Sequence, residues 1–181
     1  MEATRSKPIL QNPAPHSGGP VTPVSDAAGP APCYDLIELL FFAYRDFVGD
    51  ADRVLEIYGF GRAHHRVLHF VHRRPGLNIA QLLEILAITK QSLNRVLKDL
   101  VEQGFIDSRF GENDRRQREL FVTPAGESLA LQLAKVQALR LQRATAPLPR
   151  DTIKSFLLNM IDEEARAVTL AQVNQHQEKA R

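Results

Sequence analysis

The segment from Asp114 to Gly126 reads DRRQRELFVTPAG and decides the fold of this 181-residue chain. Its first residues are polar and arginine-rich, as in a turn, and the residues after them alternate as in a strand. It ends in Thr123 and Pro124, which are residue types that cap a helix and occupy its first position. We therefore expect a charged β-hairpin that runs directly into a helix, the arrangement of a wing.

A second informative segment, residues 89–103, has the pattern of a basic amphipathic helix capped by Thr89. Its apolar residues recur at helical spacing: Leu93, Val96, Leu97, Leu100 and Val101. The remaining face carries side chains that can hydrogen-bond base edges or phosphates, namely Lys90, Gln91, Ser92, Asn94, Arg95 and Lys98. A shorter helix that begins at Asn78 precedes it, so the pair predicts a helix-turn-helix whose second helix enters a major groove. An ordinary solvated helix face is the alternative interpretation.

The expected wing spans residues 105–122, with strands over 105–109 and 117–122. Its arginines are predicted to cluster near the tip and to suit a narrow, negative minor groove: Arg109, Arg115, Arg116 and Arg118. Asp114 is expected to hold Arg116 through a charge-assisted hydrogen bond. A hairpin that is merely soluble is the alternative.

The segments outside residues 61–123 have simpler patterns. Residues 1–32 hold seven of the eleven prolines and few large apolar residues, which predicts a disordered tail. Residues 33–60 are apolar around more than one helical face, with Gly49 and Asp50 as a candidate interruption, so a second subunit is a natural cover. After Thr123 we expect two long helices, the last of which buries Ile153, Phe156, Leu157, Met160 and Ile161.

Composition narrows the class of protein. The formal net charge is only +2, but Gly61 to Leu77 contains no carboxylate and several arginines, so one face can be basic. The single cysteine, Cys33, excludes an intrachain disulfide and a cysteine-based zinc cluster. We find neither a membrane-spanning apolar run nor a signal-peptide pattern, and therefore expect a cytoplasmic protein without a membrane partner.

The histidines could suggest a metal site, because His65, His69 and His72 share one helical face. No Cys, Asp or Glu in that segment completes a ligand set, and neighbouring arginines repel a cation. We therefore predict no metal and no cofactor, and assign His64, His65 and His69 to a candidate effector pocket. No nucleophile–base arrangement or phosphate-cradling loop is present in the sequence, so we do not expect an enzyme.

These motifs together resemble the MarR family of bacterial winged-helix regulators. The resemblance rests on Asp114-x-Arg116, Leu120-x-Val122-Thr123-x-x-Gly126, Lys90-Gln91-Ser92 and Gly104-Phe105-Ile106. It implies a homodimer joined through its terminal helices, a double-stranded DNA operator as partner, and Arg116 in or beside the minor groove. It also implies regulation by a small ligand or an oxidant, with Cys33 as a candidate redox residue. The chain departs from the family at Val122, usually leucine, and at His64-His65, usually glutamine and an aromatic residue.

The predicted fold is mainly α with a small β-hairpin wing (α+β), a winged helix-turn-helix with N- and C-terminal dimerisation helices. Residues 33–60 and 124–181 are the dimerisation regions, and 61–123 the DNA-binding domain. We expect the interface to include Leu36, Leu40, Phe41, Phe156 and Met160. The leading function is a homodimeric, sequence-specific transcriptional regulator, with repression preferred over activation. The alternatives are a winged-helix protein-interaction module without DNA binding and a metal-dependent protein that uses the histidine face.

Overall fold

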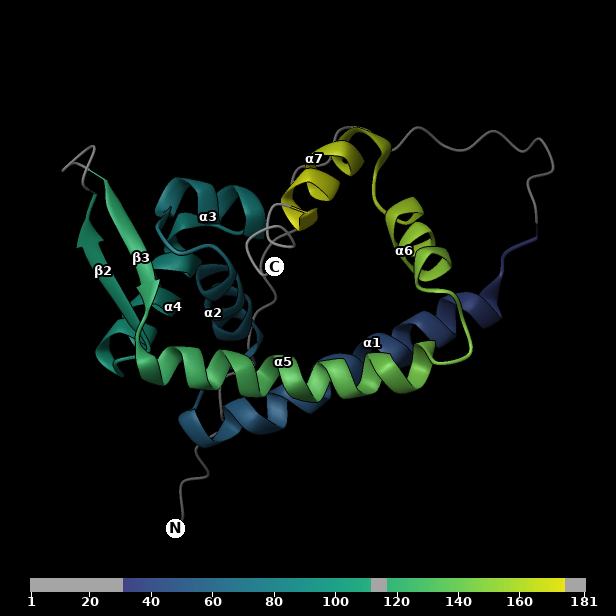
Figure 1. Ribbon diagram of the computed structural model, residues 1–181, viewed down its shortest axis with the longest axis horizontal. Coiled ribbons are helices and arrows are strands. Elements are labelled where there is room, and N and C mark those ends of the chain that lie inside the picture. The colour runs from purple at the N-terminus through teal and green to yellow at the C-terminus, as the bar shows by residue number, and fades with distance from the viewer. Residues whose placement is uncertain (1–30, 112–116, 175–181) are drawn as a thin grey trace, which may run out of the picture. The chain divides into compact units, whose positions relative to one another are not determined.

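The computed structural model describes residues 31–111 and 117–174 (Figure 1). The expected N-terminal tail lies almost entirely outside this range. So do Asp114, Arg115 and Arg116, and with them the predicted contact between Asp114 and Arg116. The chain divides into two units, Met1–Tyr34 and Asp35–Arg181, and the second holds nearly all of the described residues.

The described chain is mainly helical with one small antiparallel sheet, which confirms the predicted fold class (Figure 1). The sheet has the strand order β1-β3-β2. The elements are, in order, α1 (Tyr34–Leu55), the 3₁₀ helix η1 (Glu56–Tyr58), α2 (Arg62–Arg73), β1 (Leu77–Asn78), α3 (Ile79–Leu86), α4 (Lys90–Glu102), β2 (Ile106–Phe110), β3 (Arg118–Val122), α5 (Pro124–Thr145), α6 (Arg150–Asn159) and α7 (Glu163–Asn174).

The candidate interruption at Gly49 and Asp50 is wrong, because α1 continues through both residues to Leu55. A single glycine inside a helix costs only about 1 kcal/mol relative to alanine. Burial of Val48, Ala51 and Leu55 on the same helix offsets this cost.

The C-terminal part also differs from expectation, because two helices, α6 and α7, stand where one was predicted. Arg166 of α7 donates hydrogen bonds to the carbonyl oxygens of Leu158 (3.0 Å) and Ile161 (3.3 Å), so its guanidinium satisfies backbone acceptors at the break. The acidic start of α7, at Glu163 and Glu164, suits the positive end of a new helix dipole. No residue of α6 is buried in the protomer, so the predicted burial of Phe156 is wrong for a single subunit.

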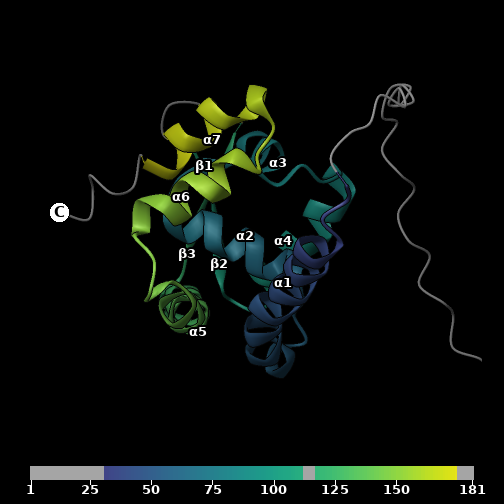
Figure 2. The same cartoon turned by 90° about the vertical axis from the view of Figure 1, so that its right-hand side faces the viewer.

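The hydrophobic core is built around α2. This helix contacts α3, α4, α5 and β3 (Figure 2). Its side chains Val67, Leu68 and Val71 are completely buried. Leu82 of α3, Leu93 and Leu100 of α4, Leu120 of β3 and Leu133 of α5 are buried in the same core. The helix-turn-helix, the wing and the first half of α5 therefore share one core. Among the described helices, none combines the length and the apolar character needed to cross a membrane.

The wing joins α5 at a tight junction formed by Thr123 and Gly126. The backbone N–H of Thr123 donates to the carbonyl oxygen of Phe105 (3.1 Å), and its hydroxyl donates to that of Gly104 (2.6 Å). The same hydroxyl accepts from the backbone N–H of Gly126 (3.1 Å), as an N-cap should. Gly126 lies so close to the Phe105 carbonyl that a Cβ atom would collide with it. The junction thus requires glycine at position 126.

Gly126→Ala should destabilise the protein by at least about 1–3 kcal/mol, the usual cost of overpacking, because a backbone carbonyl cannot move aside as a flexible side chain would. Gly49→Ala is the matched control. Its Cβ would meet only the end of the Arg53 side chain, at 4.0 Å, inside α1. That variant should gain about 0.5–1 kcal/mol from helix propensity. Urea denaturation of both variants measures the difference, and equal stabilities would contradict the junction as described.

Candidate nucleic-acid interface

The predicted recognition helix is α4, and its cap has the expected form. The Thr89 hydroxyl accepts from the backbone N–H of Ser92 (3.2 Å) and donates to the Ser92 hydroxyl (2.9 Å). Leu93, Val96, Leu97 and Leu100 are buried, whereas Val101, expected in the same stripe, is exposed. All six predicted contact residues are exposed: Lys90, Gln91, Ser92, Asn94, Arg95 and Lys98. The helix therefore presents its polar face to solvent, beginning at its positive N-terminal end.

The turn between α3 and α4 contains a feature that the sequence did not reveal. Ala87 adopts a left-handed conformation (φ +50°), which glycine adopts more readily. Arg66 of α2 donates a hydrogen bond to the carbonyl oxygen of Leu86 (2.8 Å), at the negative end of α3. A side chain from α2 therefore stabilises the turn that sets the angle between the two helices.

The wing arginines in the described part of the chain do not form one cluster. In the β2–β3 register, Arg109 lies opposite Glu119, whereas Arg118 lies opposite Phe110. Neighbouring positions along a strand face opposite sides, so Arg109 and Arg118 project from opposite faces of the wing. The guanidinium of Arg109 stacks 5.0 Å from the ring centre of Phe121, and that of Arg118 lies 4.9 Å from the ring centre of Phe110. Each aromatic ring holds one arginine on its own face, so Arg109 and Arg118 do not share a face of the wing, and the other two arginines of the predicted cluster lie outside the described residues.

The base of the wing is anchored by residues that sequence reasoning did not assign to it. β1 pairs with β3, with Leu77 opposite Leu120 and Asn78 opposite Glu119. The Asn78 side chain also donates to the Gln117 side chain (2.8 Å) while capping α3 through the backbone N–H of Gln81. Asn78 was predicted only as the start of a helix, and a two-residue strand is too short to give a periodic signal.

The histidines assigned to a candidate effector pocket separate into two environments. His64 lies against the ring of Phe60, with ring centres 4.7 Å apart, and its Nε2 is 3.1 Å from a carboxylate oxygen of Asp99 on α4. His65 and His69 instead meet each other edge to face, with ring centres 6.5 Å apart. The structure therefore brings His65 and His69 together and directs His64 to the recognition helix.

Both histidines of this pair favour their neutral forms. Desolvation lowers the pKa of His65. Desolvation, followed by the positive charges of His65, Arg73 and nearby groups, lowers the pKa of His69 to about 4. His69 keeps a solvent-exposed edge, and screening by water weakens this shift. Within residues 31–111 and 117–174, no group of three His, Cys, Asp or Glu side chains is placed to hold a metal ion.

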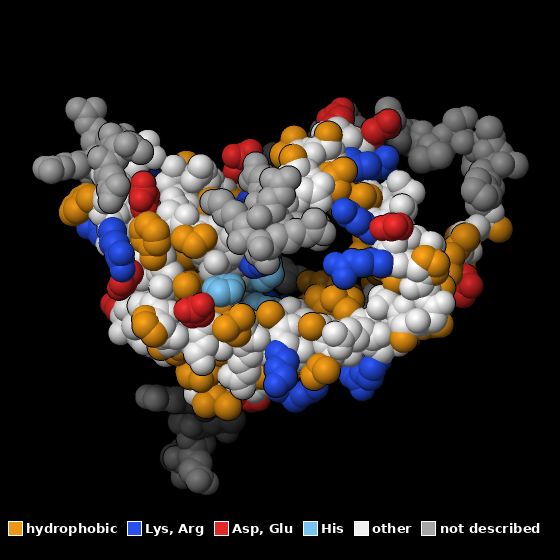
Figure 3. Space-filling model, viewed as in Figure 1, with side chains coloured by type: hydrophobic (Ala, Val, Ile, Leu, Met, Phe, Trp, Pro, Cys, Tyr) orange, Lys and Arg blue, Asp and Glu red, His pale blue; other side chains and the backbone are white. Residues whose placement is uncertain are grey.

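The residues assigned to a dimer interface are exposed in the protomer. Leu36, Leu40 and Phe41 belong to a row of exposed large apolar side chains along the first half of α1, and Phe156 and Met160 are exposed on and just after α6. Hydrophobic side chains are visible over much of the face in Figure 3. Cys33, the candidate redox residue, is an exposed free thiol just before α1.

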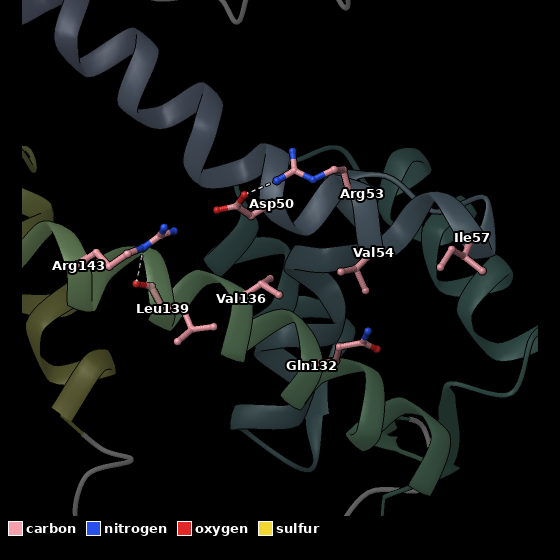
Figure 4. A pocket seen from close by; sticks show the side chains of 8 residues that line it. All are labelled: Asp50, Arg53, Val54, Ile57, Gln132, Val136, Leu139 and Arg143. Carbon is pink, nitrogen blue, oxygen red and sulfur yellow. Dashed lines mark hydrogen bonds and ion pairs between the residues drawn. The ribbon is translucent and has the colours of Figure 1, made fainter.

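A hollow of about 380 Å³ lies between α1 and α5 (Figure 4). Its walls include Val54 and Ile57 from the α1 side and Val136 and Leu139 from α5. At this hollow, Asp50 accepts hydrogen bonds from Arg140 and Arg53. The hydrogen bond from Arg140 is the main reason why the pKa of Asp50 is lowered. This ion-pair group joins α1 to α5.

The capped recognition helix, the two-stranded wing and the helix leading away from it define a winged helix-turn-helix protein. A model of the MarR family matches residues 58–117. The HTH-type transcriptional regulator PetP of Rhodobacter capsulatus is 43% identical over 133 residues, which cover 72% of this chain and 80% of PetP. The chain belongs to the MarR family of helix-turn-helix transcriptional regulators.

Solved structures show the same fold. A crystal structure of MarR is 25% identical, with a TM-score of 0.53, and the match covers 79% of this chain and 98% of that one. A mutant MarR from E. coli complexed with operator DNA is 18% identical, with a TM-score of 0.56. The match covers 73% of this chain and the whole of that one.

The depressed pKa of His69 predicts that stability falls as the pH is lowered. Unfolded histidine has a pKa near 6.5, so between roughly pH 6.5 and 4 the unfolded chain binds more protons than the folded chain. The free energy of unfolding should therefore decrease from pH 7 to pH 5. His69→Gln, which does not titrate, should lose less stability over this range, and His65→Gln should change in the same direction. Urea denaturation at both pH values tests this, and a His69→Gln protein with the wild-type pH dependence would contradict it.

Proposed function

We propose that this MarR-family regulator is a homodimer that binds a specific double-stranded operator and represses transcription. In this proposal α4 enters the major groove, and the wing, residues 105–122, lies at the minor groove. The observation that carries it is the exposed polar face of α4. Asn94 and Arg95 stand there in the N-terminal half of the helix, opposite the buried stripe that includes Leu93 and Val96. Arginine can pair with guanine and asparagine with adenine, so this face can distinguish bases.

The arrangement of the wing supports the same proposal. Arg109 and Arg118 project from opposite faces of one narrow hairpin, so a wing placed on a minor groove would present a cation toward each of the two flanking phosphate strands. Arg115 and Arg116 of the expected tip belong to the proposal as sequence predictions. The MarR neighbour with operator DNA shares this fold, which supports the proposed mode of docking.

The homodimer is supported by the apolar surface that one protomer leaves exposed. Monomeric soluble proteins rarely expose contiguous apolar patches larger than a few hundred Å². The first half of α1 exposes eight large apolar or aromatic side chains: Tyr34, Leu36, Ile37, Leu39, Leu40, Phe41, Phe42 and Tyr44. A second copy that contributes its own terminal helices, including Phe156 and Met160, would cover this row. It would also place two recognition helices on one duplex.

Modulation by a small molecule or an oxidant is the remaining part of the proposal. His65 and His69 form a neutral, partly desolvated pair that could accept a hydrogen bond from an effector. Cys33 is exposed and so accessible to an oxidant. Equilibrium binding of DNA with and without candidate effectors or peroxide would test both routes.

Selection from a pool of random duplexes tests sequence-specific binding directly. The wild-type protein should enrich one motif, and its affinity for that motif should exceed its affinity for a scrambled duplex at the same salt concentration. Arg95→Ala should lower the affinity for the selected duplex by about 1–3 kcal/mol and relax the base preference. Lys135→Ala on α5 removes the same charge from an exposed site outside the proposed interface with DNA, and should leave both properties unchanged. A wild-type protein that enriches no motif would support an interaction module in place of a DNA-binding regulator.

Leu40→Asp should dissociate the homodimer without unfolding the protomer, because Leu40 is 42% exposed and outside the core. Tight operator binding should be lost with the dimer, since two half-sites about 10 bp apart need two linked recognition helices. Val101→Asp, at a site on α4 that is 41% exposed and outside both dimerisation regions, is the control for the mass of the dimer. Light scattering gives the mass and circular dichroism the helix content. A Leu40→Asp protein that stays dimeric would show that the interface lies elsewhere.

A further inference from the structure

His64 connects α2 to the recognition helix through both of its ring nitrogens. Nδ1 accepts a hydrogen bond from the backbone N–H of Gly61 (3.1 Å), and Nε2 lies 3.1 Å from the Asp99 carboxylate, 35 positions along the chain. The ring stacks on Phe60 at an interplanar angle of 11°, and the side chain is only 15% exposed. Three contacts from different directions therefore fix the orientation of the imidazole.

The hydrogen bonds also determine which nitrogen carries the proton. The Gly61 N–H is a donor, so Nδ1 must be an unprotonated acceptor. In the neutral ring the proton is then on Nε2, which donates to Asp99. Gly61 has no side chain to cap α2, and the contact from His64 at the third helical position supplies the interaction that the N-terminus would otherwise lack. The neutral tautomer thus satisfies both partners.

The contact with Asp99 restrains α4 in a way that its apolar stripe does not. Burial of Leu93, Val96, Leu97 and Leu100 fixes which face of α4 turns inward, but hydrophobic contacts are not directional. A hydrogen bond depends on distance and angle, and so restrains the rotation of the helix about its own axis. Asn94 and Arg95 are rigidly connected to Asp99 by little more than one helical turn, so this rotation sets where their side chains meet bases.

We propose that His64 is a positioning residue for DNA recognition, which sets the rotation of α4 through Asp99 without touching DNA itself. The proposal rests on the proposed function, because it requires sequence-specific binding by α4. The proposal assigns His64 to DNA recognition and removes it from the candidate effector pocket. The neutral pair His65 and His69, which lies beside it, stays in that pocket.

Two substitutions at position 64 separate the two hydrogen bonds. The oxygen of asparagine can replace Nδ1, so His64→Asn keeps an acceptor for Gly61 and loses the contact with Asp99. The amide nitrogen of glutamine can replace Nε2, so His64→Gln keeps a donor for Asp99. With the full chain, the measured quantity is the ratio of affinities for the duplex selected by wild type and for a scrambled duplex. His64→Asn should lower this ratio about fivefold or more, as loss of a hydrogen bond to a charged group would, and His64→Gln should restore most of it.

Changes at Asp99 test the same contact from the other side. Asp99→Ala should lower the ratio as His64→Asn does, and the double variant should be no worse than either single variant, because both remove one interaction. Glu102→Ala is the matched control. This substitution removes a carboxylate from the same helix, but the ion-pair partner of Glu102 is Lys98 of α4 (3.7 Å) and not His64. The ratio of affinities for this variant should stay at the wild-type value. This control accounts for the general gain in DNA affinity when a negative charge is lost.

The outcomes distinguish the two levels of the account. Suppose that the wild-type protein binds selectively and that His64→Asn and Asp99→Ala have the same affinity ratio as wild type. This result would overturn the positioning role and leave the proposed function intact. A His64→Gln protein as impaired as His64→Asn would also overturn it, because the ring contact with Phe60 would then be the essential one. If wild type itself shows no selectivity, the proposed function fails and this inference fails with it.

Discussion

The hydrogen bonds of Thr123 hold together three parts of the winged helix-turn-helix fold. Its backbone and hydroxyl bind the carbonyls of Phe105 and Gly104, which follow the recognition helix, and its hydroxyl caps α5 at Gly126. The end of α4, the base of the wing and the start of α5 are therefore joined by hydrogen bonds to a single residue. α5 also contacts α1, through the ion pair between Arg140 and Asp50.

A second set of polar contacts joins α2 and its C-cap residue to the neighbouring helices. The hydrophobic core is built around this helix. Arg66 binds the last carbonyl of α3, His64 binds Asp99 of α4, and Arg74 binds the carbonyl oxygen of Gln172 on α7 (3.1 Å). Apolar packing gives α2 its central place, and these directional bonds fix the setting of the helices around it. The same helix carries His65 and His69, the two histidines of the proposed effector route.

Features that depend on neighbouring residues could be predicted from the sequence. The caps at Thr89 and Thr123 and the start of a helix at Asn78 follow from local chemistry, and the structure confirms them. The polar face of α4 was also predictable, because helical spacing separates it from the buried stripe.

Features that depend on distant residues could not be predicted in this way. The facing directions of Arg109 and Arg118 depend on strand register, and the partner of His64 lies on another helix. Ala87 gives no sign of its left-handed conformation, because a glycine would be expected there. The break between α6 and α7 had a signal in Asp162, Glu163 and Glu164, but apolar residues on both sides favoured one continuous helix.

In the proposed complex, α4 reads the major groove of each half-site while the wing occupies the adjacent minor groove. A dimethyl sulfate footprint on the selected duplex tests both parts, because the reagent methylates guanine N7 in the major groove and adenine N3 in the minor groove. The account predicts two groups of protected guanine N7 atoms about 10 bp apart and related by two-fold symmetry, with protected adenine N3 atoms on their outer sides. Specific binding without protection of any guanine N7 atom in a guanine-containing motif would contradict it.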